Sequence, residues 1–182
     1  MPPSRSFSIR ERDTGWCLRA NRWGEGTGVR RFFAIISRLG DGVFWYLLMG
    51  ALVLLDGLDG LAASAHMAAT GVVALALYKT LKRRTRRPRP FAADDRIRAW
   101  VAPLDEFSFP SGHTLHAVSF TLVALAYYPM LALLLVPFTA CVAASRVVLG
   151  LHYPSDVLAA TAIGLALAGA SLRVAAWMPW SG

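Results

Sequence analysis

The chain alternates long apolar runs with short, strongly charged segments. No Asp, Glu, Lys or Arg occurs from Phe107 to Ser145, and further apolar runs cover about residues 43–55, 60–78 and 157–176. A membrane helix needs roughly 20 apolar residues to cross the hydrocarbon core, so the run from Phe107 to Ser145 is long enough for two helices. Tyr127-Tyr128-Pro129 predicts the break between them, because proline interrupts a helix and tyrosine favours the membrane interface.

The first apolar run is short, and we expect its helix to begin earlier, near Phe32. That extension takes Arg38 and Asp41 close to an interface or into the bundle. The pattern then predicts an all-α fold, a polytopic transmembrane helical bundle of about five spans. Residues 4–31 mix arginines with tryptophan, leucine and isoleucine, which is typical of an amphipathic helix lying at the interface. We expect a single membrane domain over residues 1–182. It comprises an amphipathic segment at 1–31 and a helical bundle at 32–178, with candidate active-site loops at 79–110 and 146–156.

Composition supports lipid as the solvent. Of the 182 residues, 55% are hydrophobic and only 16% are charged, which is too apolar for an ordinary soluble domain. Seven of the 19 Lys and Arg residues lie in residues 1–31 and nine in residues 79–106, so charge marks the ends of the spans. The net charge of +8 also allows a nucleic-acid partner, but contact with anionic lipid headgroups explains basic segments that flank apolar spans. We therefore expect a multi-pass protein of the cell membrane, the inner membrane in a bacterium, with no nucleic-acid partner.

The first candidate segment for chemistry is the cationic run from Lys82 to Pro90, at the end of the second span. By itself such a run is typical of a solvated or headgroup-binding surface. Pro88 and Pro90 cannot continue a helix, so the chain becomes extended there and is able to direct Arg89 back toward the bundle.

The second segment, from Phe107 to Thr114, directly precedes the third span. A helix that starts near Ser111 directs unsatisfied backbone N–H groups outward, and Gly112 lets an anion approach them closely. Ser111 adds a hydroxyl donor, and His113 brings a titratable proton to the same place. The same residues also fit an ordinary helix start with a polar cap. His116, one turn later, is expected to pack rather than to react.

The third segment, from Ser145 to Asp156, lies between the fourth and fifth spans. Arg146 ends a long apolar run, where an arginine is costly unless it is paired or faces water, so it indicates a functional site. Asp156 follows His152 by four residues, and a carboxylate that accepts a hydrogen bond from one imidazole nitrogen fixes the tautomer and leaves the other nitrogen free to attack. The alternative is that Asp156 only caps a helix and His152 lies at the interface.

The three segments emerge on one side of the membrane, because two spans separate the second from the third. A pocket with three cations, a helix N-terminus and two histidines suits a tetrahedral oxyanion. Together the segments resemble the type 2 phosphatidic acid phosphatase family, which shares its phosphate site with vanadium haloperoxidases. The resemblance covers roughly residues 40–176, and the three family signatures are complete in order and spacing: Lys-six residues-Arg-Pro from Lys82 to Pro90, Pro-Ser-Gly-His from Pro110 to His113, and Ser-Arg-five residues-His-three residues-Asp from Ser145 to Asp156.

By this resemblance, His152 is the nucleophile, Asp156 orients it, and His113 is the general acid for the leaving alcohol. The residues implied to hold the phosphoryl oxygens are Lys82, Arg89, Ser111, Gly112 and Arg146. The resemblance implies a phosphatase that hydrolyses a lipid phosphate or pyrophosphate (phosphatidate, phosphatidylglycerol phosphate or undecaprenyl pyrophosphate) through a phosphohistidine. Phosphoryl transfer requires mainly positioning and charge stabilisation, which the cations supply, so no metal or other cofactor is expected. Many bacterial members have six spans, whereas an arginine-rich amphipathic stretch replaces the first span here.

Three other functions share parts of this pattern. A lipid phosphotransferase would pass the phosphoryl group to an acceptor other than water. A vanadate-dependent haloperoxidase has the same pocket, but those proteins are typically soluble and much longer. A non-catalytic binder of anionic lipid would need the charges but not the histidines. The side of the membrane also stays open, because the resemblance implies an extracytoplasmic site whereas the arginines of residues 1–31 favour the cytoplasm.

Overall fold

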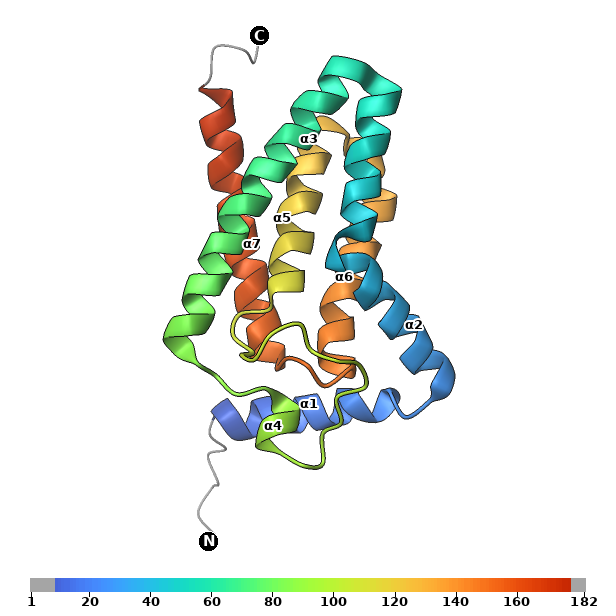
Figure 1. The fold of residues 1–182 in the computed structure, drawn as a ribbon, viewed down its shortest axis with the longest axis vertical. Coiled ribbons are helices and arrows are strands. Elements are labelled where there is room, and N and C mark those ends of the chain that lie inside the picture. The colour runs from blue at the N-terminus through green and yellow to red at the C-terminus, as the bar shows by residue number, and fades with distance from the viewer. Residues whose placement is uncertain (1–8, 178–182) are drawn as a thin grey trace, which may run out of the picture.

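The computed structural model describes residues 9–177, which form helices and connecting loops without a strand (Figure 1). A bundle of long helices stands on a short helix, α1, that lies across one end. The elements in chain order are α1 (Ile9–Trp23), α2 (Thr27–Arg38), the π-helical turn η1 (Leu39–Val43), α3 (Phe44–Thr85), α4 (Pro90–Ala93), α5 (Gly112–Tyr127), the 3-10 turn η2 (Pro129–Leu131), α6 (Ala132–Val148) and α7 (Pro154–Ala176).

Three helical stretches of the described chain are long and apolar enough to cross a membrane: Thr27–Ala93, Pro129–Val148 and Pro154–Ala176. The first of them reverses direction at Gly57, whose backbone is left-handed with φ 54° and ψ −119°. Glycine adopts this conformation without the penalty that a Cβ would bring. Figure 1 shows the two arms that result, residues 27–56 rising and residues 58–85 descending.

The two arms, α5, α6 and α7 correspond to the five helical segments that the apolar pattern predicts. The transmembrane helical bundle is therefore confirmed, and α5 ends at Tyr127 beside the predicted break at Pro129. α5 packs against α3, α6 and α7, so it is the central helix. Its N-terminus is consequently held at the inner end of the polar loops.

Large apolar side chains cover the outside of the bundle. Leu54, Leu133 and Leu158 have exposed fractions of 87%, 91% and 69%. A soluble protein rarely exposes apolar surface on this scale, and a lipid bilayer would cover it. The core between the helices is aromatic, with Trp45 within 5.3 Å of Phe120 between ring centroids.

The predicted N-terminal amphipathic helix is present as α1, but it is more than an interfacial helix. Trp16 and Trp23 are exposed, whereas Cys17 is completely buried. Asn21 is also buried, and its amide donates to the carbonyl oxygens of Arg98 and Val148 at 2.9 and 3.0 Å. α1 is thus hydrogen-bonded to the loop that contains Arg98 and to the end of α6 at Val148. It lies at the end of the bundle where the connecting loops gather (Figure 1). The part of the predicted segment before Ile9 lies outside the described residues, and α2 continues across the predicted border at residues 31 and 32.

Candidate active site

A cavity of about 520 Å³ lies between the two arms, α5 and the polar loops. Its polar end contains six of the eight residues singled out from the sequence: Lys82, Arg89, Gly112, His113, Arg146 and His152. The other two, Ser111 and Asp156, are fully buried. Ser111 directly precedes Gly112 in the chain, and Asp156 follows His152 by four residues. The tertiary structure therefore brings all three sequence segments to one place.

The cationic segment leaves the helix as predicted. Arg86 adopts a left-handed conformation with φ 47° that ends α3 after Thr85. Arg89 is extended, with ψ 156°, and its guanidinium is only 2% exposed. Its Nη1 donates to the carbonyl oxygen of Leu151 at 2.7 Å, so the guanidinium lies directly beside the loop that carries His152.

Asp105 occupies the space between two of the predicted phosphate-binding cations. Lys82 Nζ donates to both carboxylate oxygens of Asp105, at 2.6 and 2.8 Å, and Arg89 Nη2 donates to one of them at 2.7 Å. Burial favours the neutral acid, but the hydrogen bonds and charges of Lys82 and Arg89 outweigh it and lower the pKa of Asp105. The ionised carboxylate of Asp105 therefore occupies a site suited to phosphate. The sequence analysis missed Asp105, whose only local signal is its place between the first two segments.

His152 lies in the turn between α6 and α7 and is only 1% exposed. Gly150 makes the turn possible with φ 74°, a conformation that favours glycine. Burial, followed by the charges of Arg146, Arg89 and Lys82, lowers the pKa of His152 well below its ordinary value. The imidazole is consequently neutral near pH 7, with Nε2 lying 3.4 Å from Nη1 of Arg89.

Asp156 lies beside the other imidazole nitrogen but does not form the predicted hydrogen bond in this structure. Its Oδ2 is 3.6 Å from Nδ1 of His152, and that nitrogen has no hydrogen-bond partner among the described residues. Asp156 instead accepts the backbone N–H of Tyr153 at 2.9 Å and Nη1 of Arg87 at 2.7 Å. The carboxylate therefore caps α7 and also remains next to the histidine, so both sequence interpretations describe part of its environment.

Arg87 joins Asp156 to the N-terminal helix. Its Nη2 donates to Asp13 Oδ2 at 2.6 Å, and Asp13 also accepts the backbone N–H of Ser155 at 3.0 Å. Two carboxylates and one guanidinium thus pair across α1, the loop after α3 and the start of α7. The sequence analysis included Arg87 only as a member of the cationic run and had no signal for Asp13.

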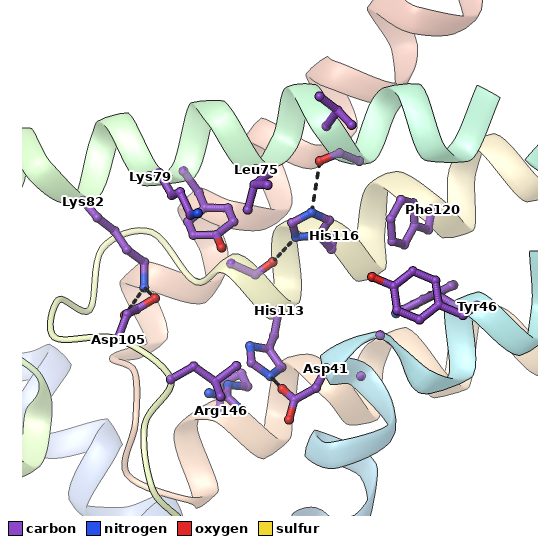
Figure 2. Close-up of a pocket in the computed structure, with 18 of the residues that line it drawn as sticks. Asp41, Tyr46, Leu75, Lys79, Lys82, Asp105, His113, His116, Phe120 and Arg146 are labelled. Atoms are coloured by element: carbon purple, nitrogen blue, oxygen red, sulfur yellow. Dashed lines mark hydrogen bonds and ion pairs between the residues drawn. The ribbon is translucent and has the colours of Figure 1, made fainter. Parts of the chain in front are cut away.

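His113 and Arg146 form the wall of the cavity toward the first arm (Figure 2). Nε2 of His113 pairs with the carboxylate of Asp41, and Nη1 of Arg146 donates to the hydroxyl of Ser37. The prediction that Asp41 enters the bundle or lies near an interface is confirmed, since this carboxylate lines the cavity. Its pairing with His113 and the role of Ser37 were not foreseen, because they depend on how η1 packs against α5.

The start of α5 combines a cap with an open backbone. The hydroxyl of Ser111 accepts from the hydroxyl of Thr114 at 3.0 Å, so this side chain acts as the helix cap. Gly112 faces the cavity, where an added Cβ would lie 3.4 Å from the ring of Tyr78. His116 also lines the cavity, with its ring nitrogens 3.0 Å from the carbonyl oxygen of Gly112 and 3.2 Å from that of Gly71 (Figure 2).

Comparison with known proteins agrees with this fold. The PAP2 superfamily profile matches residues 60–180, and the chain belongs to that superfamily. Phosphatidylglycerophosphatase B of Escherichia coli K12 is 42% identical over 78 residues, and the protein of the same name from Shigella flexneri matches equally. The match covers 40% of this chain and 29% of each relative's length.

Two solved structures have the same fold. The transmembrane PAP2 type phosphatidylglycerolphosphate phosphatase from Bacillus subtilis has a TM-score of 0.76 at 21% identity, covering 98% of this chain and 91% of that chain. Aquifex aeolicus LpxE has a TM-score of 0.72 at 21% identity, covering 92% of this chain and 97% of that chain. Both likenesses extend over the whole bundle and therefore support its architecture.

Proposed function

We propose that this protein is a membrane lipid phosphate phosphatase that works through a phosphohistidine. The observation that carries the proposal is one cavity with two chemically different ends. Its polar end has Lys82, Arg89 and Arg146 around two histidines, as an oxyanion requires. The rest of its lining, between the two arms and α5, is mainly apolar and includes Trp45, Met49, Val72, Leu75 and Phe120. A phosphate at the polar end would therefore place an attached hydrocarbon chain against apolar side chains.

In the proposed first step, Nε2 of His152 attacks phosphorus and the bond from phosphorus to the lipid oxygen breaks. The neutral state of His152 supports this role, because a lone pair on the ring is unprotonated at neutral pH. His113 gives its proton to the leaving oxygen, while the three cations, the Ser111 hydroxyl and the backbone N–H of Gly112 hold the phosphoryl oxygens. Oδ2 of Asp156 lies 3.6 Å from Nδ1 of His152 and would accept a hydrogen bond from it as the ring becomes charged.

In the proposed second step, water attacks the phosphohistidine and His113 takes its proton. No step in this scheme requires a metal ion or another cofactor. The substrate class is a lipid phosphomonoester or pyrophosphate, and the names of the Escherichia coli and Bacillus subtilis relatives put phosphatidylglycerol phosphate first among the candidates. We further propose one multi-pass domain over residues 1–182 in a bacterial inner membrane.

The direct test is phosphate release by the purified protein in detergent containing EDTA. The panel comprises phosphatidylglycerol phosphate, phosphatidate and undecaprenyl pyrophosphate. We expect release from at least one of them without added metal, and competitive inhibition by vanadate, which mimics the trigonal-bipyramidal phosphoryl group. Absence of release from the whole panel, or activity that returns only with magnesium, would contradict the proposal.

Asp105 supplies a second prediction, because substrate must displace its carboxylate from Lys82 and Arg89. We expect Asp105→Asn to lower the inhibition constant of vanadate by about tenfold, the effect of roughly 1.4 kcal/mol. The pKa of Asp105 is lowered, so its carboxylate is ionised at any pH above the usual pKa of an aspartate. The negative charge that competes with vanadate is lost only when the pH falls through the lowered pKa. The difference between variant and wild type should therefore persist from pH 8 to pH 5, as vanadate titrations of the purified proteins would measure.

Glu106→Gln is the matched control, since it removes one negative charge from the adjacent residue of the same loop. It should leave the inhibition constant within about twofold of the wild type, the size of a screened surface effect. Equal inhibition constants in Asp105→Asn and Glu106→Gln would show that the Asp105 carboxylate does not compete for the anion site.

A further inference from the structure

A second cavity, of about 390 Å³, meets the candidate active site from another direction. It lies between α2 and the loop that precedes α5. Its own walls are formed from α2 by Ala34, Ile35, Ser37 and Arg38, and from the loop by Val101 and Ala102. It shares four lining residues with the first cavity, namely Asp41, Leu104, His113 and Arg146. His113 is therefore accessible from two separate spaces.

The two spaces are bounded by different elements of the fold. The first cavity extends from the cations along the apolar faces of the two arms, which suits a hydrocarbon chain. The lining of the second is also largely apolar, but it includes Ser37 and Arg38, and the Arg38 side chain is 82% exposed. Small polar molecules from the solvent thus have a route to His113 that does not pass between the arms.

The chemistry of the proposed function requires such a route. In a phosphoryl transfer, the attacking and leaving groups lie roughly in line with phosphorus. The lipid oxygen therefore leaves opposite His152, at His113, and water must later attack from that same side. As long as the lipid alcohol remains in the first cavity, water cannot arrive from there.

We infer that the second cavity is the entry path and binding site for the hydroxyl nucleophile of the second step, which is water in hydrolysis. This inference rests on the proposed function. The water oxygen forms a bond to phosphorus, and the bond between phosphorus and Nε2 of His152 breaks with its electron pair returning to the nitrogen. The proton of water passes to the His113 imidazole, whose positive charge then lies against the carboxylate of Asp41. Asp41 is thus a positioning residue on the wall common to both cavities.

The test narrows the second cavity from its two opposite walls, with Ala34→Trp on α2 and Ala102→Trp on the loop. Ala102 is exposed and Ala34 is partly exposed, and neither lines the first cavity. Rapid-quench experiments would follow release of the lipid alcohol, release of phosphate and the acid-labile phosphohistidine. We expect both variants to retain the initial burst of lipid alcohol while phosphate release slows several-fold and phosphoenzyme accumulates.

A partition experiment gives a readout that does not depend on how much of a variant is folded. With glycerol present, the phosphoenzyme divides between water and glycerol, and the ratio of glycerol phosphate to phosphate measures access of the larger hydroxyl compound. Narrowing the second cavity should lower this ratio several-fold. Phe32→Trp, an exposed position of α2 in neither lining, should match the wild type. Ala68→Trp, which lines only the first cavity, should raise the KM for lipid and leave the ratio unchanged.

The outcomes separate this inference from the proposed function. If both narrowed variants match Phe32→Trp in phosphoenzyme level and in partition ratio, the second cavity is not the path of the nucleophile. If the wild-type protein releases neither lipid alcohol nor phosphate, the proposed function itself fails. If Ala68→Trp lowers the partition ratio as strongly as Ala34→Trp, the nucleophile enters through the first cavity instead.

Discussion

Replacing His152 with alanine should reduce phosphate release from the lipid substrate to background. The variant removes the only side chain that forms a bond to phosphorus in the proposed scheme, so we expect a loss on the order of 10⁵-fold or more, as for other covalent nucleophiles. No phosphohistidine should be trapped after acid-free quenching.

A matched histidine provides the control for this prediction. His66 lies in the second arm, more than four helical turns before Lys82, and Nδ1 of its ring is 3.0 Å from the hydroxyl of Tyr127. His66→Ala should retain turnover close to that of the wild type. Thermal unfolding in detergent would verify that His152→Ala keeps its fold. Substantial turnover by a folded His152→Ala protein on any lipid phosphate would refute the phosphohistidine mechanism.

Replacing His113 with alanine should have the second largest effect, and the effect should depend on the leaving group. General acid catalysis typically contributes about 10²–10⁴-fold, and we expect a loss of this size with a lipid alcohol as the leaving group. A nitrophenolate needs little protonation to leave, so the phosphorylation step with nitrophenyl phosphate should fall far less. Single-turnover measurements of alcohol and nitrophenol release compare the two substrates directly.

The second half of the reaction distinguishes His113 from a residue that only binds substrate. Water is a poor nucleophile without a base, so the His113→Ala phosphoenzyme should hydrolyse slowly and accumulate when nitrophenyl phosphate is the donor. Ser37→Ala is a useful comparison, because it removes the hydroxyl that Arg146 contacts while both histidines remain. An equal loss for both leaving groups in His113→Ala would argue against its role as the acid.

Much of the fold follows from local sequence. The apolar runs predict the helical segments because crossing lipid requires a fixed length of apolar side chains with every backbone group bonded inside the helix. Pro129 and the cationic run mark where α5 and α3 end, since proline and crowded charge act on neighbouring residues only. Each of the three site segments was likewise found from the spacing of its residues, because each segment contributes several site residues that lie close together in the chain.

The pairing of charges within the site was decided by packing. Asp105 reaches Lys82 and Arg89 across a loop, Asp41 reaches His113 from the first arm, and Asp13 reaches Arg87 from α1. Each carboxylate is separated from its partner by many residues, so no periodicity or spacing identifies it.

The shape of the site also depends on the tertiary structure. The reversal at Gly57 sets the distance between the two arms and hence the apolar part of the first cavity. The packing of α2 against the loop before α5 leaves the second cavity beside His113. Spacing in the chain predicts which residues share a helix face or a turn, whereas a cavity and its ion pairs depend on side chains from several helices whose relative positions only the packed bundle defines.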